Sequence, residues 1–242
     1  MKIRLLIATL VVMISIAFSG CASSTADNNV TPANNTATNN STEKSNLNVN
    51  NTADTNATAN ANTATTAVTV GAPAPTFSLE DQDGKKVSLS DFAGKIVVLE
   101  WINPDCPFVK RHYDAKTMTT TAEKYKGKDV VWLAVNTTSY MGKDKYKEWI
   151  KTHNISYPIL DDHEGLVGNM YGAKTTPHMY IIGKDGKLAY QGSIDDDPGG
   201  DKGKETINFV DQALAELTSG KSVSQPQTKP YGCSVKYAKK SS

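Results

Sequence analysis

The sequence predicts an α/β domain in which a central mixed sheet is covered by helices on both faces. Residues 96–102 form a mostly apolar, β-branched run, which is typical of a buried central strand. Segments with helical spacing follow this run and alternate with further short apolar runs. Two short apolar segments joined at Asp185-Gly186 predict a β-hairpin, and a last amphipathic helix follows it. This order predicts layers of helix, sheet and helix.

The first 20 residues have the pattern of an export signal. Lys2 and Arg4 precede an almost continuous apolar run from Leu5 to Phe18, and small residues follow it. The run is shorter than the roughly 20 residues that span a bilayer. We therefore expect residues 1–20 to be a cleaved signal peptide, with an uncleaved short membrane anchor as the alternative.

Residues 21–67 are expected to be a disordered tether that begins at Cys21. The stretch is rich in Asn, Thr, Ala and Ser and has no aromatic residue, so it cannot bury enough apolar surface to offset its chain entropy. Ser19-Gly20-Cys21 resembles a bacterial lipobox, which implies that Cys21 is acylated and holds an exported protein on a membrane. The formal net charge of +1 argues against a nucleic-acid partner.

The folded domain is expected over residues 68–220, followed by a tail over residues 221–242. Its first part should contain a hairpin with a turn at Asp83-Gly84, the strand at 96–102, and one helix that begins near Cys106 and continues to Tyr125. The remaining predicted elements are a buried strand at 130–135, a helix around Tyr146, Trp149 and Ile150, a short edge strand at 157–160, a short helix around Leu166, Val167 and Met170, strands at 179–182 and 188–190, and a last helix bearing Ile207, Val210, Leu214 and Leu217.

Cys106 is the candidate catalytic nucleophile. It follows a buried strand and precedes Pro107, which is favoured in the first turn of a helix. A helix N-terminus carries partial positive charge and free N–H groups, which stabilise a thiolate and lower the pKa of a cysteine. Lys110 and Arg111, one turn later, are expected to strengthen this field.

Cys233 is the candidate partner of Cys106, because Cys21 is assigned to lipid and the chain has three cysteines. The tail that carries Cys233 could fold back over the sheet edge. In our leading hypothesis, the Cys106 thiolate attacks an oxidised sulfur and Cys233 resolves the product. Two alternatives remain: a structural disulfide that pins the tail, and a free thiol at Cys233.

The remaining polar clusters predict no metal site. The acidic pairs and triplets at 161–162 and 195–197 lack a glycine-containing ligand loop, and solvated turns or backbone caps are the preferred interpretation. The four histidines are scattered, although His178 is expected to approach Cys106. We expect no cofactor.

The domain resembles the peroxiredoxin-like 1 group, within the redoxin (alkyl hydroperoxide reductase and thiol-specific antioxidant) branch of the thioredoxin superfamily. The matching stretches are residues 103–110 (NPDCPFVK), 171–173 with Thr176-Pro177, 185–188 (DGKL), 194–196 (IDD) and 232–237 (GCSVKY). The resemblance implies a thioredoxin-like three-layer α/β/α sandwich with a central mixed sheet. It also implies a cis bond before Pro177, beside an exposed backbone edge that pairs with substrate. The candidate substrate-contact residues are Trp101, Pro107, Thr176 and Pro177, with a role in the core as the favoured alternative for Trp101.

The chain departs from better-known relatives at one position. Val109 stands where thioredoxins have the second cysteine of Cys-x-x-Cys and where true peroxiredoxins have the cysteine that reacts with peroxide. The expected function is therefore a thiol-disulfide oxidoreductase of antioxidant type at the cell envelope, facing the periplasm or the exterior, with peroxidase activity disfavoured. Its partners would be a disulfide-bearing protein or a small oxidised-sulfur compound, and an external thiol reductant. The alternative is a tethered, non-catalytic binding module with a structural Cys106–Cys233 disulfide.

Overall fold

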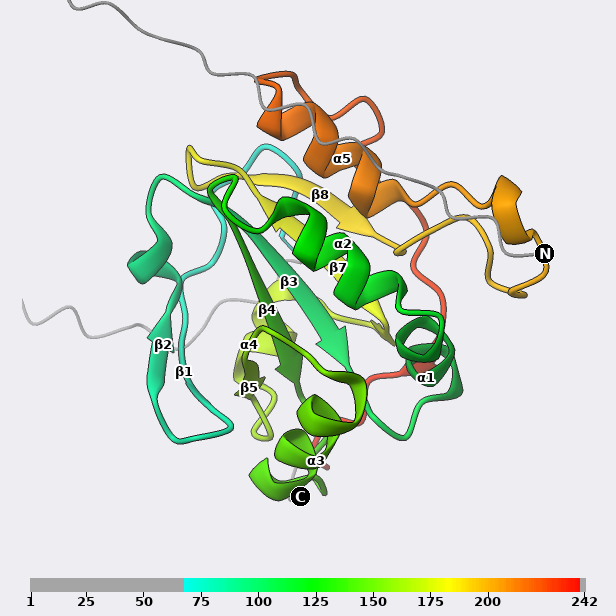
Figure 1. Cartoon of the computed structure of the whole chain (residues 1–242). Helices are drawn as coiled ribbons and strands as arrows, with labels where there is room; N and C mark the ends of the chain where they lie inside the picture. The colour runs from blue at the N-terminus through cyan, green and yellow to red at the C-terminus, as the bar shows by residue number, and fades with distance from the viewer. Residues whose placement is uncertain (1–67, 240–242) are drawn as a thin grey trace, which may run out of the picture. The chain divides into compact units, whose positions relative to one another are not determined.

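The computed structural model describes residues 68–239, which include nine strands and five α-helices (Figure 1). The predicted export signal, Cys21 and the whole of the predicted tether, residues 21–67, lie outside the described residues. The elements, in chain order, are β1 Ser78–Asp81, β2 Lys86–Ser88, the 3₁₀ helix η1 Leu89–Phe92, β3 Ile96–Ile102, α1 Pro107–Asp114, α2 Thr117–Tyr125, β4 Val130–Asn136, α3 Lys143–His153, β5 Ile159–Asp161, α4 Leu166–Tyr171, β6 Thr175–Thr176, β7 His178–Ile182, β8 Leu188–Gly192, the 3₁₀ helix η2 Gly203–Glu205, α5 Phe209–Thr218 and β9 Cys233–Ser234.

Seven strands form one mixed sheet in the order β2-β1-β5-β4-β3-β7-β8. Strand β3 lies near the middle, parallel to β4 and antiparallel to β7. All seven residues of β3 are buried, as its apolar composition predicts for a strand covered on both faces. The strands β6 and β9 form a separate two-stranded sheet.

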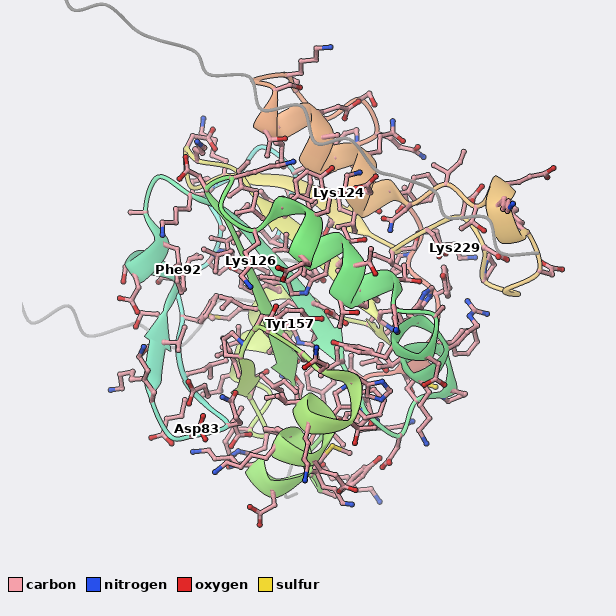
Figure 2. All side chains as sticks on the ribbon, viewed as in Figure 1. Asp83, Phe92, Lys124, Lys126, Tyr157 and Lys229 are labelled. Carbon is pink, nitrogen blue, oxygen red and sulfur yellow. The ribbon has the colours of Figure 1, made fainter. Side chains whose placement is uncertain are left out.

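Two apolar clusters cover the two faces of the seven-stranded sheet. Helices α1, α2, α3 and α5 contribute to one cluster, together with Val98 and Ile102 of β3. Helix α4 and the N-terminal segment contribute to the other cluster, together with Leu99 and Trp101. Successive residues of β3 therefore point to opposite faces, as strand geometry requires. The predicted α/β sandwich with a mixed sheet, of thioredoxin-like type, is confirmed. Figure 2 shows that charged side chains such as Asp83 and Lys229 project from the periphery.

Three element predictions are wrong in detail. The single helix expected from Cys106 to Tyr125 is two helices, because Lys116 adopts a left-handed conformation (φ 59°) and its N–H bonds to the carbonyl of Tyr113. The strand expected at an edge, β5, lies between β1 and β4, because the β1–β2 hairpin extends the sheet beyond it. Ile207 precedes α5 and is 49% exposed, so it does not belong to the apolar face of that helix.

The C-terminal tail packs on the domain along much of its length. The backbone of Gln191 in β8 pairs with Pro226 and Thr228, while further along the tail Val235 donates to the carbonyl of Lys174. Within residues 68–239, no helix is long and apolar enough to cross a membrane.

Candidate functional site

Cys106 is the N-cap residue of α1, and Pro107 occupies the first turn. Strand β3 ends at Ile102, and a four-residue connection brings the chain to the helix start. Pro107 is preorganised for this position because its ring fixes φ and its missing N–H is not needed there. The sequence placed Cys106 at a helix N-terminus, and the structure confirms that position. Its side chain is only 2% exposed.

The Cys106 sulfur lies against the loop that precedes β7. In the thiol form it donates a hydrogen bond to the carbonyl of Thr176 at 3.0 Å. The Thr176–Pro177 peptide bond is cis, as the family resemblance implied. Both Thr176 and Pro177 are buried, whereas Pro107 is exposed. Of the expected substrate-contact residues, these three thus lie beside Cys106 in space or in sequence.

Trp101 does not join this group. It is fully buried in the cluster on the other face of the sheet, and its indole N–H donates to the hydroxyl of Thr137 at 3.1 Å. It has no free surface for a bound substrate, so the expected substrate contact is wrong and the expected role of Trp101 in the core is confirmed.

Cys233 lies in β9, directly opposite Thr176. The antiparallel register pairs Thr176 with Cys233 and Thr175 with Ser234. Because the Cys106 sulfur contacts Thr176, this pairing brings the two thiols into hydrogen-bonding contact. Both cysteines are free thiols in this structure, and Cys233 is half-buried. The expected proximity of Cys106 and Cys233 is therefore present, but the exposed cis-proline edge is not, because the chain's own tail covers it.

Several side chains hold the tail on either side of Cys233. The Thr228 hydroxyl lies 2.6 Å from the Tyr190 hydroxyl and accepts the N–H of Ser193 at 2.9 Å. Beyond the cysteine, the Tyr237 hydroxyl donates to the carbonyl of Ala173 at 2.8 Å. These contacts fix the tail on β8 and near α4, so it is an ordered part of the domain within the described residues.

Two glycines permit this close approach. A Cβ at Gly192 would overlap Thr228, and a Cβ at Gly232 would overlap the Thr176 carbonyl. Gly232 also has φ 130°, which other residues rarely adopt. The glycine before Cys233 therefore allows β9 to lie flat against the cis-proline loop.

The two thiols have opposite pKa shifts. For Cys106, burial raises the pKa, but hydrogen bonds from the Cys233 thiol, the Val109 N–H, the Thr176 hydroxyl and the Cys233 N–H outweigh it and lower the pKa from 9.0. For Cys233, burial and the neighbouring sulfur of Cys106 raise the pKa to about 11. Cys106 is consequently the more acidic thiol of the pair, and Cys233 the less acidic one.

Tyr231 connects the tail to α1 and was not identified from the sequence. Its hydroxyl donates to the carboxylate of Asp195 and lies 2.9 Å from Nε2 of His112. Burial lowers the pKa of His112, although the charge of Asp195 opposes this shift. In the sequence, only its position two residues before Cys233 indicated a role for Tyr231 near the candidate site.

Arg111 does not strengthen the field at Cys106 as expected. Its guanidinium donates to the carbonyls of Asp197 and Pro198, at 2.8 and 2.9 Å. Asp197 is itself buried and accepts N–H groups from residues 200–202, which lowers its pKa to about 2 despite burial. The capping interpretation of this acidic triplet is confirmed, whereas the solvated-turn interpretation is wrong for Asp195 and Asp197.

Glu100 is a buried carboxyl six residues before Cys106. It faces the same apolar cluster as Cys106, since Val98 and Ile102 belong to that cluster. One oxygen accepts the Trp132 indole N–H at 2.7 Å, while the other has no hydrogen-bond partner among residues 68–239. Burial raises the pKa of Glu100 to about 7. A single acidic residue within an apolar strand was the signal for this site, and the sequence reasoning missed it.

His178 does not serve Cys106. Its Nδ1 lies 3.0 Å from the Tyr180 hydroxyl, and burial lowers its pKa to about 3. No cluster of His, Cys, Asp or Glu side chains suited to a metal occurs within residues 68–239.

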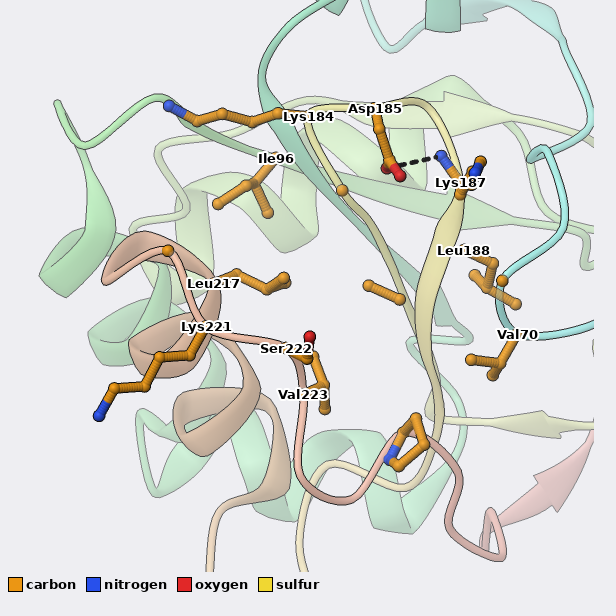
Figure 3. A pocket seen from close by; sticks show the side chains of 15 residues that line it. Val70, Ile96, Lys184, Asp185, Lys187, Leu188, Leu217, Lys221, Ser222 and Val223 are labelled. Carbon is orange, nitrogen blue, oxygen red and sulfur yellow. Dashed lines mark hydrogen bonds between the residues drawn. The ribbon is translucent and has the colours of Figure 1, made fainter.

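A cavity of about 630 Å³ lies away from the two cysteines, between β8 and the chain that follows α5 (Figure 3). Leu188, Leu217 and Val223 line it, with Lys184 and Lys221 among its other residues. None of the site residues described above contributes to it.

Comparison with known proteins shows which proteins this chain is similar to. A thiol-disulfide oxidoreductase ResA from Bacillus thuringiensis is 26% identical over 149 residues, which cover 62% of this chain and 79% of that protein. A second ResA, from Geobacillus thermodenitrificans, is 33% identical over 121 residues, covering 49% of this chain and 66% of that protein.

Among solved structures, an uncharacterised conserved protein from Geobacillus kaustophilus superposes with a TM-score of 0.65 at 28% identity, covering 72% of this chain and 94% of that one. A hypothetical protein from Sinorhizobium meliloti gives the same TM-score at 25% identity, covering 72% and 97%. Residues 70–191 match the AhpC/TSA family, and the cis-proline loop and helix-start cysteine lie within this range. The chain belongs to the AhpC/TSA family.

Proposed function

We propose that this protein is a thiol-disulfide oxidoreductase that alternates between a Cys106/Cys233 dithiol and a Cys106–Cys233 disulfide. One observation carries the proposal: the register of β9 on β6 places Cys233 opposite Thr176, whose carbonyl contacts the Cys106 sulfur. The names of the ResA relatives support the same reaction class.

The reaction starts from the Cys106 thiolate, which attacks one sulfur of an oxidised partner. A mixed disulfide forms, and the second sulfur of the partner leaves with the electron pair of the broken bond. The Cys233 thiol then attacks the Cys106 sulfur and releases the remaining partner thiol, while its proton passes to the departing sulfur. The partner gains two electrons, and the pair becomes a disulfide that an outside thiol donor must reduce.

The buried position of Cys106 limits which partners reach it. With 2% of its surface exposed, Cys106 meets a large partner only when β9 separates from β6. A small oxidised-sulfur compound needs a smaller opening than a protein disulfide. Peroxide reduction of the peroxiredoxin type is not part of the proposal, because Val109 is a buried core residue.

We also propose that the reaction takes place at the cell envelope, on the periplasmic or outer side. The proposal rests on the export-signal pattern at residues 1–20 and on Cys21 as a lipid-bearing residue. An exported compartment permits the disulfide to form. The polar stretch that follows Cys21 would tether the domain to the membrane.

The competing function is a binding module in which the same disulfide is structural. The test uses the whole chain with Cys21→Ser, so that Cys106 and Cys233 are the only thiols. After treatment with oxidised glutathione, tryptic peptides 96–110 and 222–236 should be linked. The chain should also accelerate the reduction of insulin disulfides by dithiothreitol.

Cys106→Ser and Cys233→Ser should each abolish this acceleration, whereas the matched control Ser234→Ala, at the exposed neighbouring position, should retain it. A linked pair without acceleration would favour the binding module. Two thiols that never link would contradict both functions.

A further inference from the structure

The two sulfurs of the proposed redox pair differ in their access to solvent. Cys106 is 2% exposed and sits beneath the cis-proline loop and the tail. Cys233 is half-buried on β9, a strand of the tail with no other strand on its outer side among residues 68–239. An outside molecule therefore meets Cys233 before it meets Cys106.

The tail that produces this difference is held by contacts that do not involve either sulfur. Tyr231 bonds to Asp195 and His112 before the cysteine, and Tyr237 bonds to the Ala173 carbonyl after it. These anchors hold the tail in place while both cysteines are free thiols. A disulfide would add a covalent link to a tail that is already in place.

The same tail occupies the backbone edge at which an outside strand would otherwise pair. Thr175 and Thr176 are paired with Ser234 and Cys233. Gly232 lies so close to the Thr176 carbonyl that no space remains for another chain in that register. In the disulfide form, a partner that needs to add a strand at the cis-proline edge is excluded.

We infer that the outside thiol that reduces the Cys106–Cys233 disulfide attacks the sulfur of Cys233, and that Cys106 is the leaving group. This inference rests on the proposed function. If the cysteine at the helix start were the exposed one, the outside thiol would attack that cysteine instead; here Cys106 is buried and Cys233 is the more accessible sulfur. The partner class is a thiol that can approach a surface cysteine without inserting a chain beside Pro177.

The electrons balance over two steps. In the first, an outside thiolate forms a bond to the Cys233 sulfur, and the Cys106–Cys233 bond breaks with its electron pair on Cys106. In the second, another outside thiolate attacks the outside sulfur of the mixed disulfide and forms an outside disulfide. Cys233 leaves and takes up a proton. Two outside thiols are oxidised, and the protein ends as a Cys106 thiolate and a Cys233 thiol.

The local chemistry favours Cys106 as the leaving group. Its pKa is lowered, whereas the pKa of Cys233 is raised to about 11, and the thiol of lower pKa leaves faster. The N–H groups of Val109 and Cys233 already point at the Cys106 sulfur and receive its charge as the bond breaks. The greater solvent access of Cys233 and the better leaving-group ability of Cys106 therefore both favour attack on the Cys233 sulfur.

The test maps the first mixed disulfide. The whole chain with Cys21→Ser is oxidised until peptides 96–110 and 222–236 are linked, then mixed with reduced glutathione. Samples are quenched in acid at successive times, treated with N-ethylmaleimide and digested. Extrapolated to zero time, glutathione should be on the Cys233 peptide in about tenfold or greater excess, with the alkyl group on Cys106.

Glutathione on the Cys106 peptide, or equal amounts on the two peptides, would overturn the inference and leave the proposed function intact. Failure of the two peptides to link before glutathione is added would instead overturn the proposed function. The two failures are therefore read from separate steps of one experiment.

Discussion

Replacing Glu100 with glutamine should change how the stability of the domain depends on pH. The Glu100 carboxyl is fully buried, and one of its oxygens has no hydrogen-bond partner in the part of the chain that the structure describes. Its pKa rises from 4.5 to about 7 because burial disfavours the charged form. The folded protein therefore binds a proton more tightly than the unfolded chain between these two values.

The sign and size follow from proton linkage. The contribution of Glu100 is fully present below about pH 4.5 and is lost as pH rises through about 7. At roughly 1.4 kcal/mol for each pH unit, the loss amounts to about 3 kcal/mol. Glu100→Gln cannot ionise and keeps an oxygen for the Trp132 indole, so it should lack this loss.

Urea unfolding at a series of pH values measures the effect. Relative to the wild type, Glu100→Gln should gain about 3 kcal/mol between about pH 4.5 and pH 8. The matched control Glu205→Gln changes an exposed carboxyl in η2 and should follow the wild-type curve. Parallel curves for wild type and Glu100→Gln would refute the buried, proton-binding carboxyl.

Three further predictions test the tail and the buried imidazole. Tyr231→Phe removes a hydroxyl that bonds to the buried carboxylate of Asp195 and to the imidazole of His112, which should weaken the attachment of the tail by about 1.5–3 kcal/mol. Iodoacetamide should therefore label Cys106 about tenfold faster or more. The control Tyr140→Phe, at a 64% exposed position, should not change the labelling rate. Gly232→Ala places a Cβ against the Thr176 carbonyl, so β9 should no longer lie close to the cis-proline loop. Disulfide formation by oxidised glutathione should therefore be slower. The control Gly142→Ala, at a glycine with open space around it, should form the disulfide at the wild-type rate. Burial lowers the pKa of His178 to about 3. Because the unfolded chain then binds a proton more tightly than the folded protein, the free energy of unfolding should fall by roughly 1.4 kcal/mol per pH unit as pH drops below about 6.5. His178→Gln should flatten this slope when unfolding is measured at acid pH.

The sheet and the position of Cys106 could be predicted because they depend on local patterns. The apolar run of β3 and the Asp185-Gly186 turn between β7 and β8 are each decided by neighbouring residues. The same holds for the cysteine followed by Pro107 at a helix start.

The path of the tail could not be predicted in this way. The segment from Ser222 to Pro230 is polar and contains prolines, so its composition indicated only a connection of unspecified path. Its position depends on contacts with distant residues, such as Thr228 with Tyr190 and Tyr231 with Asp195. Each contact joins segments more than thirty residues apart. The spacing of apolar residues along the chain gives no information about such distant contacts.

The break between α1 and α2 has a similar explanation. Ala115, Met118 and Tyr125 continue a helical spacing across the break, but Lys116 takes a left-handed conformation that spacing does not reveal. Met118 and Tyr125 remain buried in spite of the break. The pattern therefore located the buried face correctly and the helix boundary incorrectly.

The reduction potential of the Cys106–Cys233 pair tests the central claim most directly. The whole chain with Cys21→Ser is equilibrated in glutathione buffers of graded ratio, and the linked fraction of peptides 96–110 and 222–236 is measured. A redox-active pair should titrate reversibly between about −120 and −270 mV, the range of thiol-disulfide exchange proteins. A pair that stays linked below about −300 mV, as structural disulfides do, or one that never links, would contradict the account.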